Sequence, residues 1–216
     1  MRLGVLASGS GSNLQAILDG CASGRIPAQV AVVICNVPGA KAIERAEKAG
    51  VPAVLLEHRQ FASRDEYDRQ VVATLRRHRV ELVCLAGFMR LIGPVLLKEF
   101  HNKILNIHPS LLPAFPGLHA VRQALAAGVR VSGCTVHVVD AGTDTGPILI
   151  QAAVPVIDGD TEETLAARIL AQEHGCYPRA IALWAQGRVE IDGRRVRIAG
   201  ATGETARTLA SPELVD

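Results

Sequence analysis

The sequence predicts an α/β fold: a doubly wound, mostly parallel sheet with antiparallel strands in the C-terminal half. Several short runs in the first half are nearly continuous in apolar residues, as strands covered on both faces are. Segments in which charged and apolar residues recur at helical spacing separate these runs. Two longer β-rich runs then follow one another with no helix-length segment between them. The alternation favours right-handed crossovers and a parallel sheet, and the adjacent β-rich runs favour an antiparallel pair.

The first half is expected to supply the parallel strands. The apolar runs cover residues 3–7, 30–34, 51–56, 82–85 and 104–107. The helix-like segments cover residues 14–21, 41–49 and 64–79. A strand followed by a helix is the repeating unit of a doubly wound sheet, so helices should cover both of its faces.

The second half is expected to begin with the antiparallel strands 131–139 and 148–156, joined by the loop 140–147. A helix should follow from the N-cap Thr161 to about Trp184, because acidic residues fill its first turn and apolar spacing continues beyond it. Pro178 should kink or break that helix. Later in the chain, Asp192-Gly193 is a strong signal for a two-residue hairpin turn.

Composition limits the class of protein. A chain of 216 residues with 49% hydrophobic and 20% charged residues can bury one large core, so residues 1–200 are expected to form a single domain. Residues 201–216 lack periodicity and are expected to form a flexible tail. A net charge of +2 and 3% aromatic residues argue against binding to nucleic acid.

The cysteines and the apolar segments indicate a compartment. The five cysteines contain no Cys-x-x-Cys pair and lie scattered over apolar segments, which is typical of reduced and mostly buried thiols. No apolar stretch is long enough to span a bilayer, and the N-terminus lacks the pattern of a signal peptide. We therefore expect a cytoplasmic protein without membrane association.

The stretch Asn106-Ile-His-Pro-Ser-Leu-Leu-Pro113 carries the clearest chemical signal. Alternation along a strand places Asn106 and His108 on the same face at its C-terminal end. An amide and an imidazole together suit a developing oxyanion. The alternative interpretation is a core histidine beside a turn. Prolines at 109, 113 and 116 predict that the chain beyond His108 is irregular and lines a cleft.

This stretch, with Phe115-Pro-Gly-Leu-His119 after it, resembles the signature of the phosphoribosylglycinamide formyltransferase family, which is folate-dependent and serves purine synthesis. The resemblance covers roughly residues 1–190. It implies a Rossmann-like formyltransferase fold and transfer of a formyl group from the co-substrate 10-formyltetrahydrofolate to the amino group of glycinamide ribonucleotide. It also implies Asn106 and His108 as catalytic residues, small-molecule partners and no metal.

A Gly-rich loop, residues 8–13, lies between the first expected strand and helix. Its glycines let the backbone approach a ligand, and the helix start offers free N–H groups, so a phosphate fits there. The alternatives are a tight connection or a dinucleotide site, but Leu14 replaces the third glycine and Cys35-Asn36 provides no acidic residue for a ribose. The resemblance implies that the loop binds the ribonucleotide phosphate through Gly11, Ser12 and Asn13.

The segment 85–92 leaves the fourth expected strand at the end where open α/β sheets bind ligands. Packing at the strand end, with a solvated arginine, is the alternative interpretation. The resemblance implies that the segment lies along the folate through Met89, Arg90, Leu91 and Ile92. It also makes Arg90 a partner for the acidic tail of the folate, and more weakly Arg64.

Asp144 lies in the loop after the long β-rich run. A carboxylate close to an imidazole favours the charged ring and fixes its orientation. From spacing alone, we expect Asp144 to be a turn aspartate that satisfies its own loop by accepting hydrogen bonds within it. The resemblance implies instead that Asp144 pairs with the catalytic histidine and that the loop holds the pterin, through Asp140, Ala141, Gly142, Thr143 and Asp144. Glu173 reads as a surface charge, but the resemblance implies that it binds the ribose hydroxyls.

Alternatives to this function remain open. His119 and His137 lack the close spacing of a metal site, and His137 is expected to be buried and hydrogen-bonded. A 10-formyltetrahydrofolate hydrolase or a methionyl-tRNA formyltransferase would carry a further domain, for which this chain has no room. A non-catalytic nucleotide-binding module would bind phosphate but not folate. The sequence leaves open whether the protein is a monomer or a homodimer.

Overall fold

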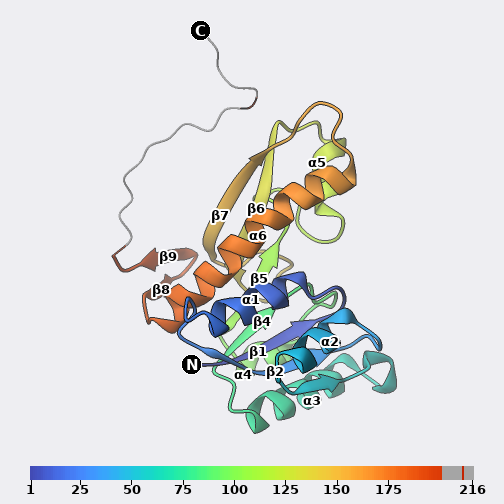
Figure 1. Cartoon of the computed structure of the whole chain (residues 1–216), viewed down its shortest axis with the longest axis vertical. Helices are drawn as coiled ribbons and strands as arrows, with labels where there is room; N and C mark the ends of the chain where they lie inside the picture. Colours follow the sequence, from blue (N-terminus) through green and yellow to red (C-terminus); the bar gives the residue numbers. More distant parts are fainter. Residues whose placement is uncertain (201–210, 212–216) are drawn as a thin grey trace.

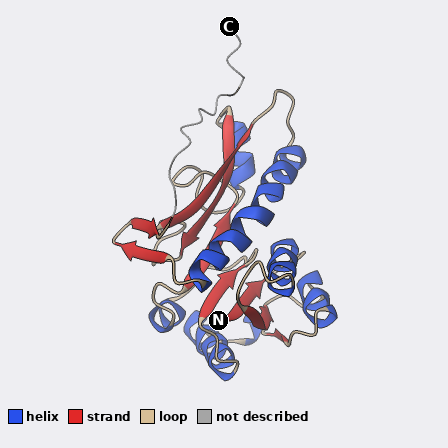
Figure 2. Ribbon diagram, turned by 60° about the vertical axis from the view of Figure 1, so that its left-hand side comes forward, coloured by secondary structure: helices blue, strands red, loops and turns tan. Residues whose placement is uncertain are grey.

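The computed structural model describes residues 1–200 and Ser211. Its centre is a seven-stranded sheet in the order β3-β2-β1-β4-β5-β6-β7 (Figures 1 and 2). The first five strands are parallel, and β6 and β7 are antiparallel to their neighbours. The strands are β1 Arg2–Ala7, β2 Gln29–Cys35, β3 Ala53–Leu55, β4 Leu82–Leu85, β5 Ile104–His108, β6 Val131–Val138 and β7 Ile148–Pro155. The predicted fold class is therefore confirmed.

Helices cover both faces of this sheet. Residues of α1, α2, α5 and α6 share one hydrophobic core with the sheet, and residues of α3 and α4 share the other. The helices are α1 Ser12–Ala22, α2 Lys41–Lys48, α3 Arg64–Arg77, α4 Pro94–Glu99, α5 Ala120–Ala126 and α6 Glu162–Ala185, with the 3-10 turn η1 His58–Gln60 before α3. The sequence did not predict α4 and α5, which have six and seven residues and are too short to establish a helical period.

Strand β3 is shorter than predicted. The expected strand covered residues 51–56, but β3 contains only Ala53–Leu55. It lies at the edge of the sheet, and its three residues pair with three residues of β2. Apolar character alone could not show where the pairing stops.

Helix α6 begins as predicted and continues past Pro178. Thr161 caps it, since its hydroxyl accepts a hydrogen bond from the Thr164 N–H. The helix then runs unbroken to Ala185, so Pro178 does not break it, which was one of the two outcomes expected there. Pro178 and Tyr177 are both buried, and the Tyr177 hydroxyl lies 3.0 Å from the Leu85 carbonyl. Packing on the sheet therefore outweighs the hydrogen bond that a proline cannot donate.

The C-terminal hairpin differs from its prediction by one residue. Strands β8 Val189–Asp192 and β9 Arg195–Ile198 pair Asp192 with Arg195. The two turn residues are therefore Gly193 and Arg194, not Asp192-Gly193. Gly193 has a φ of 57°, which a hairpin turn of this length requires at its first position. The expected tail, 201–216, lies outside the described residues except for Ser211.

The structure also bears on the expected cysteines and on membrane-spanning helices. Cys35, Cys84 and Cys134 are buried, and Cys21 and Cys176 are partly buried, as predicted for thiols in apolar segments. Within residues 1–200, no helix is both long enough and apolar enough to cross a membrane.

The strand order places three predicted segments together. It reverses between β1 and β4, and open α/β sheets bind ligands beyond the carboxyl ends of the strands at such a point. The Gly-rich loop leaves β1, the segment 86–92 leaves β4, and β5 ends at His108. Ser8 connects the first two, because its N–H donates to the Gly87 carbonyl at 3.1 Å and its hydroxyl accepts from the Met89 N–H at 2.9 Å.

Candidate active site

Strand β5 brings Asn106 and His108 to one side of the sheet, as their alternation predicted. It lies between β4 and β6, with Asn106 opposite His137 and His108 opposite Thr135. Both side chains reach Asp144, which comes from the loop after β6. Pairing on both sides fixes the backbone of β5, so the amide and the imidazole are held in a defined relation.

His108 lies between two oxygen acceptors. Its Nδ1 is 3.4 Å from Asp144 Oδ2, and its Nε2 is 2.9 Å from the Phe115 carbonyl oxygen. A carbonyl only accepts, so Nε2 carries a proton. The positively charged ring, with a proton on each nitrogen, satisfies both acceptors at once. Each nitrogen of the ring therefore faces an oxygen acceptor, which fixes the orientation of the ring.

The Asp144 carboxylate is in contact with groups outside the loop 140–147. The Gly117 N–H donates to Oδ2 at 2.8 Å, and His137 Nε2 lies 3.5 Å from Oδ1. The interpretation of Asp144 as a turn aspartate that satisfies its own loop is therefore wrong. Burial alone would raise the pKa of Asp144, but the close His137 ring, the hydrogen bond from the Gly117 N–H and the His108 ring lower it below its ordinary value. Asp144 is consequently ionised at neutral pH.

His137 orients the Asn106 amide. It is 1% exposed, with Nδ1 3.1 Å from the Val138 carbonyl and Nε2 3.1 Å from Asn106 Nδ2. If Nδ1 donates to the carbonyl, Nε2 accepts from the amide, which fixes the tautomer. Asn106 Nδ2 also donates to Asp144 Oδ1 at 3.4 Å. The prediction that His137 is buried and hydrogen-bonded is confirmed.

The Gly-rich loop ends in a left-handed residue. Gly11 has a φ of 68°, and α1 begins at Ser12. Asn13 is buried, and its Nδ2 donates to Glu173 Oε2 of α6 at 2.7 Å. The Asn13 Oδ1 is buried without a hydrogen-bond partner. Leu14, which replaces the third glycine of a dinucleotide loop, is fully buried in the core.

Glu173 is not the surface charge that its sequence context indicated. It is 6% exposed, because it lies on the side of α6 that faces Asn13 of α1. Burial raises the pKa of its carboxyl, and the hydrogen bond from Asn13 opposes that rise. Sequence spacing could not show this, because Asn13 and Glu173 are 160 residues apart.

A Glu173→Gln variant tests this burial. A carboxyl whose pKa is raised by folding stabilises the protein fully below its unfolded value of about 4.3, and this contribution is lost as the pH rises through the folded pKa. The melting temperature of the parent protein should therefore fall relative to that of the variant as the pH rises from about 4, by about 2–4 °C for each kcal/mol. Melting curves measured across this range check the sign, and parallel curves for the two proteins would contradict it.

The segment 86–92 exposes apolar side chains beyond the carboxyl end of β4. Met89 is 69% and Leu91 56% exposed, so packing at the strand end does not explain them. The Arg90 guanidinium lies 5.1 Å from the centre of the Tyr67 ring, which orders it by a cation–π contact. Arg64 is the first residue of α3 and is exposed, and Ile92 is partly buried.

The side chain of Asp140 stabilises the loop 140–147 by accepting two hydrogen bonds from within it. Asp140 Oδ1 accepts from the Gly142 N–H at 3.1 Å and from the Thr145 hydroxyl at 2.6 Å. Ala141, Gly142 and Thr143 are exposed, whereas Asp144 turns inward at a φ of 53°. One loop therefore contains three exposed residues and a partly buried carboxylate.

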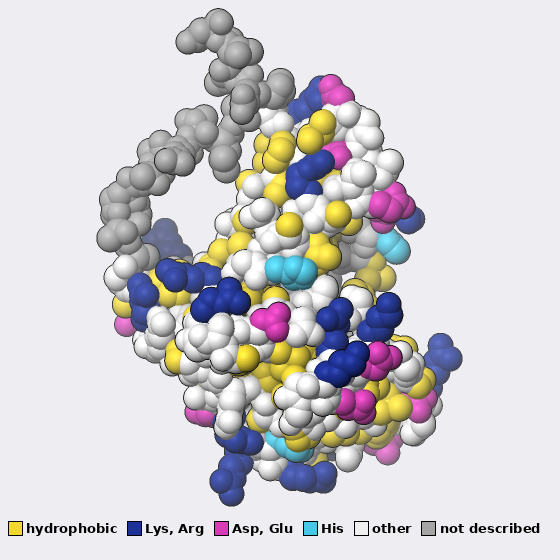
Figure 3. Space-filling model, viewed as in Figure 1, with side chains coloured by type: hydrophobic (Ala, Val, Ile, Leu, Met, Phe, Trp, Pro, Cys, Tyr) yellow, Lys and Arg dark blue, Asp and Glu magenta, His cyan; other side chains and the backbone are white. Residues whose placement is uncertain are grey.

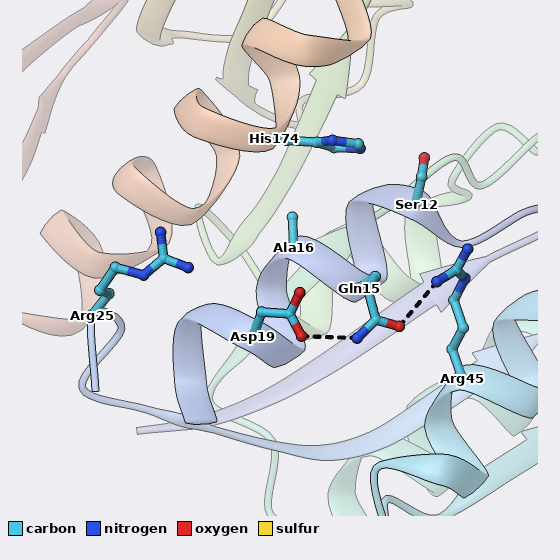
Figure 4. Close-up of a pocket in the computed structure, with 7 residues that line it drawn as sticks. All are labelled: Ser12, Gln15, Ala16, Asp19, Arg25, Arg45 and His174. Atoms are coloured by element: carbon cyan, nitrogen blue, oxygen red, sulfur yellow. Dashed lines mark hydrogen bonds between the residues drawn. The ribbon is translucent and has the colours of Figure 1, made fainter. Parts of the chain in front are cut away.

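A second feature lies on the outer side of α1. An open pocket of about 340 Å³ is lined by Ser12, Gln15, Ala16, Asp19, Arg25, Arg45 and His174 (Figure 4). It borders the Gly-rich loop through Ser12 but does not include Asn106, His108 or Asp144. Within the described residues, no group of three or more His, Cys, Asp or Glu side chains is arranged to hold a metal ion.

Sequence reasoning missed three residues that support this site. Ser8 joins the ends of β1 and β4, Phe115 offers its carbonyl to His108, and Gly117 donates its N–H to Asp144. The two latter residues have φ values of 55° and 79°. The Pro-Gly pair at 116–117 signals such a turn, but only the fold shows which groups the turn aims at the site.

The fold and the cluster of Asn106, His108 and Asp144 define a formyl transferase. The sequence model of the family described as formyl transferase matches residues 1–181, and the chain belongs to that family. It is 47% identical to the phosphoribosylglycinamide formyltransferase of Bacillus subtilis, covering 83% of this chain and 92% of that protein. The crystal structure of glycinamide ribonucleotide transformylase 1 from Symbiobacterium toebii superposes with a TM-score of 0.91 at 60% identity, covering 92% of this chain and 93% of that one.

A longer relative contains a similar segment. The trifunctional purine biosynthetic protein adenosine-3 of Drosophila pseudoobscura pseudoobscura is 50% identical over 188 residues. The match covers 86% of this chain but only 14% of that protein.

Proposed function

We propose that this protein transfers a formyl group from 10-formyltetrahydrofolate to the amino group of glycinamide ribonucleotide, a step of purine synthesis. The observation that carries the proposal is the contact of one ionised carboxylate, Asp144, with both an amide and an imidazole donor at 3.4 Å. The names of the full-length relatives support the choice of substrates.

The reaction needs a stabilised oxyanion. The neutral amine of the ribonucleotide attacks the formyl carbon on N10 of the folate, and the carbonyl oxygen gains negative charge. Asn106 and the His108 imidazolium donate hydrogen bonds to it. Their contacts with Asp144 are long, at 3.4 Å, so a stronger acceptor can draw both donors toward itself.

Proton transfer completes the exchange. His108 gives a proton to N10 as the old bond breaks, and the neutral ring then takes up the proton that the attacking nitrogen loses as its bond to carbon forms. Asp144 orients the ring and favours its charged form before this transfer. No covalent enzyme intermediate is required, because the Ser110 hydroxyl donates to the Ala114 carbonyl and burial raises the pKa of the Cys84 thiol far above neutral.

We assign the two substrates to opposite sides of Asn106, His108 and Asp144. Gly11, Ser12 and Asn13 bind the phosphate of the ribonucleotide, since free N–H groups gather at the start of α1. Glu173, beside Asn13, accepts from the ribose hydroxyls. The folate lies beyond the carboxyl ends of β4 and β5, against Arg64, Met89, Arg90, Leu91, Ile92, Asn106 and the loop residues Asp140, Ala141, Gly142, Thr143 and Asp144.

The remaining parts of the proposal concern the protein as a whole. The donors that the chemistry needs are all side chains, so the reaction requires no metal. We assign residues 1–200 to a single catalytic domain that acts in the cytoplasm as a monomer or a homodimer on these two small molecules.

Release of tetrahydrofolate tests the proposal. Purified protein is mixed with 10-formyltetrahydrofolate, and the tetrahydrofolate formed is measured with and without glycinamide ribonucleotide. Release that depends on the ribonucleotide is the expected result. Equal release without it would make the protein a hydrolase, and no release, together with binding of the ribonucleotide, would make it a non-catalytic nucleotide-binding module.

A further inference from the structure

A buried amide, Asn36, lies beside Ser8 at the carboxyl ends of two adjacent strands. The parallel ladder pairs Ala7 of β1 with Cys35 of β2, so the residues that follow, Ser8 and Asn36, leave the sheet side by side. The charged side chains of α2, which comes next in the chain, gather on the surface (Figure 3). Asn36 is instead 3% exposed. A buried amide needs hydrogen-bond partners inside the protein.

The hydrogen bonds of Asn36 form a chain that runs in one direction through Ser8. The Met89 N–H donates to the Ser8 hydroxyl oxygen at 2.9 Å, and that hydroxyl donates its single proton to Asn36 Oδ1 at 2.6 Å. Asn36 Nδ2 lies 3.4 Å from His58 Nδ1, which accepts in the neutral tautomer with its proton on Nε2. Because the hydroxyl proton goes to Asn36, the lone pairs of Ser8 remain free for Met89. Asn36 therefore sets the direction of the bond between Ser8 and Met89.

This chain anchors the segment 86–92, which contains neither helix nor strand. Ser8 contacts the segment at two points, since its N–H also donates to the Gly87 carbonyl at 3.1 Å. Gly87 has a φ of 71°, so the backbone turns between the end of β4 and Met89. An irregular backbone follows a path that its anchors determine. The Ser8 hydroxyl thus fixes the point from which the exposed side chains of Met89 and Leu91 extend.

The Gly-rich loop has further anchors that do not involve Asn36. The Gly9 carbonyl accepts from the Ala42 N–H of α2 at 3.2 Å. A Cβ at Gly11 would lie 2.9 Å from Ala42 Cα, so α2 packs directly against this loop. Removal of the Asn36 side chain should therefore loosen the segment 86–92 and leave the loop in place.

We infer that Asn36 is a positioning residue for the formyl donor, and that it acts through Ser8. By accepting the hydroxyl proton, it holds the Met89 N–H and with it the backbone along which the folate is proposed to lie. Buried hydrogen bonds in a chain also strengthen one another. The inference rests on the proposed function, because it takes the segment 86–92 as part of the folate site.

Steady-state kinetics of Asn36→Ala test this role. The KM for 10-formyltetrahydrofolate should rise by about three- to tenfold, as expected for one weakened hydrogen bond. The KM for glycinamide ribonucleotide and the turnover number should stay within about twofold of the parent values. An Asn36→Asp variant keeps an oxygen that accepts the Ser8 proton, so its KM for the folate should lie close to that of the parent. Equal rises in both KM values, or an unchanged KM for the folate, would overturn the inference.

A double variant shows whether Asn36 acts through Ser8. The KM for the folate in Ser8→Ala/Asn36→Ala should equal that in Ser8→Ala within about twofold, because no hydroxyl remains for Asn36 to orient. Additive losses would overturn the inference. Ser132→Ala is the matched control, since Ser132 is 2% exposed and its hydroxyl has no hydrogen-bond partner among the described residues. Its KM values should match those of the parent, and a rise equal to that in Ser8→Ala would show a merely structural effect.

Binding of tetrahydrofolate separates this inference from the proposed function. Its affinity for the folded parent, Asn36→Ala and Ser8→Ala is measured calorimetrically, with circular dichroism to compare their folds. A loss of about three- to tenfold in the variants supports Asn36 even if the parent transfers no formyl group. Equal affinity would overturn the inference while leaving the proposed function intact, and a parent that binds no tetrahydrofolate would also overturn it. If Asn36→Ala does not fold, Ser8→Ala carries the same test, because it removes the acceptor of the Met89 N–H.

Discussion

The His108→Ala variant should lose at least about two decades of turnover number, because it removes both an oxyanion donor and the proton for the leaving nitrogen. The KM values should change far less, since the ring is buried between Asp144 and Phe115 and offers little surface for substrate binding. Tetrahydrofolate release at saturating concentrations of both substrates gives this number.

A control for this variant lies just ahead of β5. His101 is exposed and has no place in the proposed site, so His101→Ala should keep the parent turnover number. Melting curves of both variants ensure that the comparison is between folded proteins. If His108→Ala retained the parent turnover number, the proton donor would have to be another group.

The Asp144→Asn variant should show the second large effect, again about two decades or more in turnover number. The amide keeps the shape of the side chain but removes the negative charge that His108 and His137 face at 3.4 and 3.5 Å. The charged imidazole then loses its partner, and an amide N–H can point at a nitrogen that should itself donate. Asp158→Asn, at an exposed carboxylate that pairs with Arg130, is the control for loss of charge.

The pH dependence of stability identifies the same carboxylate. The pKa of Asp144 is lowered in the folded protein, so its contribution to stability is present above the unfolded value of about 3.9 and is lost as the pH falls through the folded pKa. The parent should therefore lose stability on acidification below about pH 4 more steeply than Asp144→Asn. For Glu173, by contrast, we expect the contribution to stability to be lost as the pH rises. Acid unfolding curves of identical steepness would contradict it.

The sequence predicted the fold well because most of its strands are buried on both faces and read as uninterrupted apolar runs. Strand β4 is the clearest case, with all four residues buried and the bounds predicted. The predictions that failed concern features that tertiary contacts determine. Pairing with β2 sets the length of β3, and packing of α6 on the sheet carries the helix through Pro178.

The site was predictable in part for the same reason. The alternation of Asn106 and His108 is local and follows from the geometry of a strand. The approach of Asp144 is not local, since it depends on the return of the chain through β6 and on a turn that aims Gly117 at the carboxylate. The burial of Glu173 depends on the packing of α6 against α1, and the spacing of its own helix does not reveal it.

The most direct measurement follows the formyl carbon itself. 10-Formyltetrahydrofolate labelled with ¹³C in the formyl group is incubated with the protein and glycinamide ribonucleotide, and the products are examined by NMR and mass spectrometry. The account predicts that the label appears as a formamide on the ribonucleotide amine, in amounts equal to the tetrahydrofolate formed, and that His108→Ala abolishes it. Label recovered as free formate, or no transfer of label by the parent protein, would contradict the account.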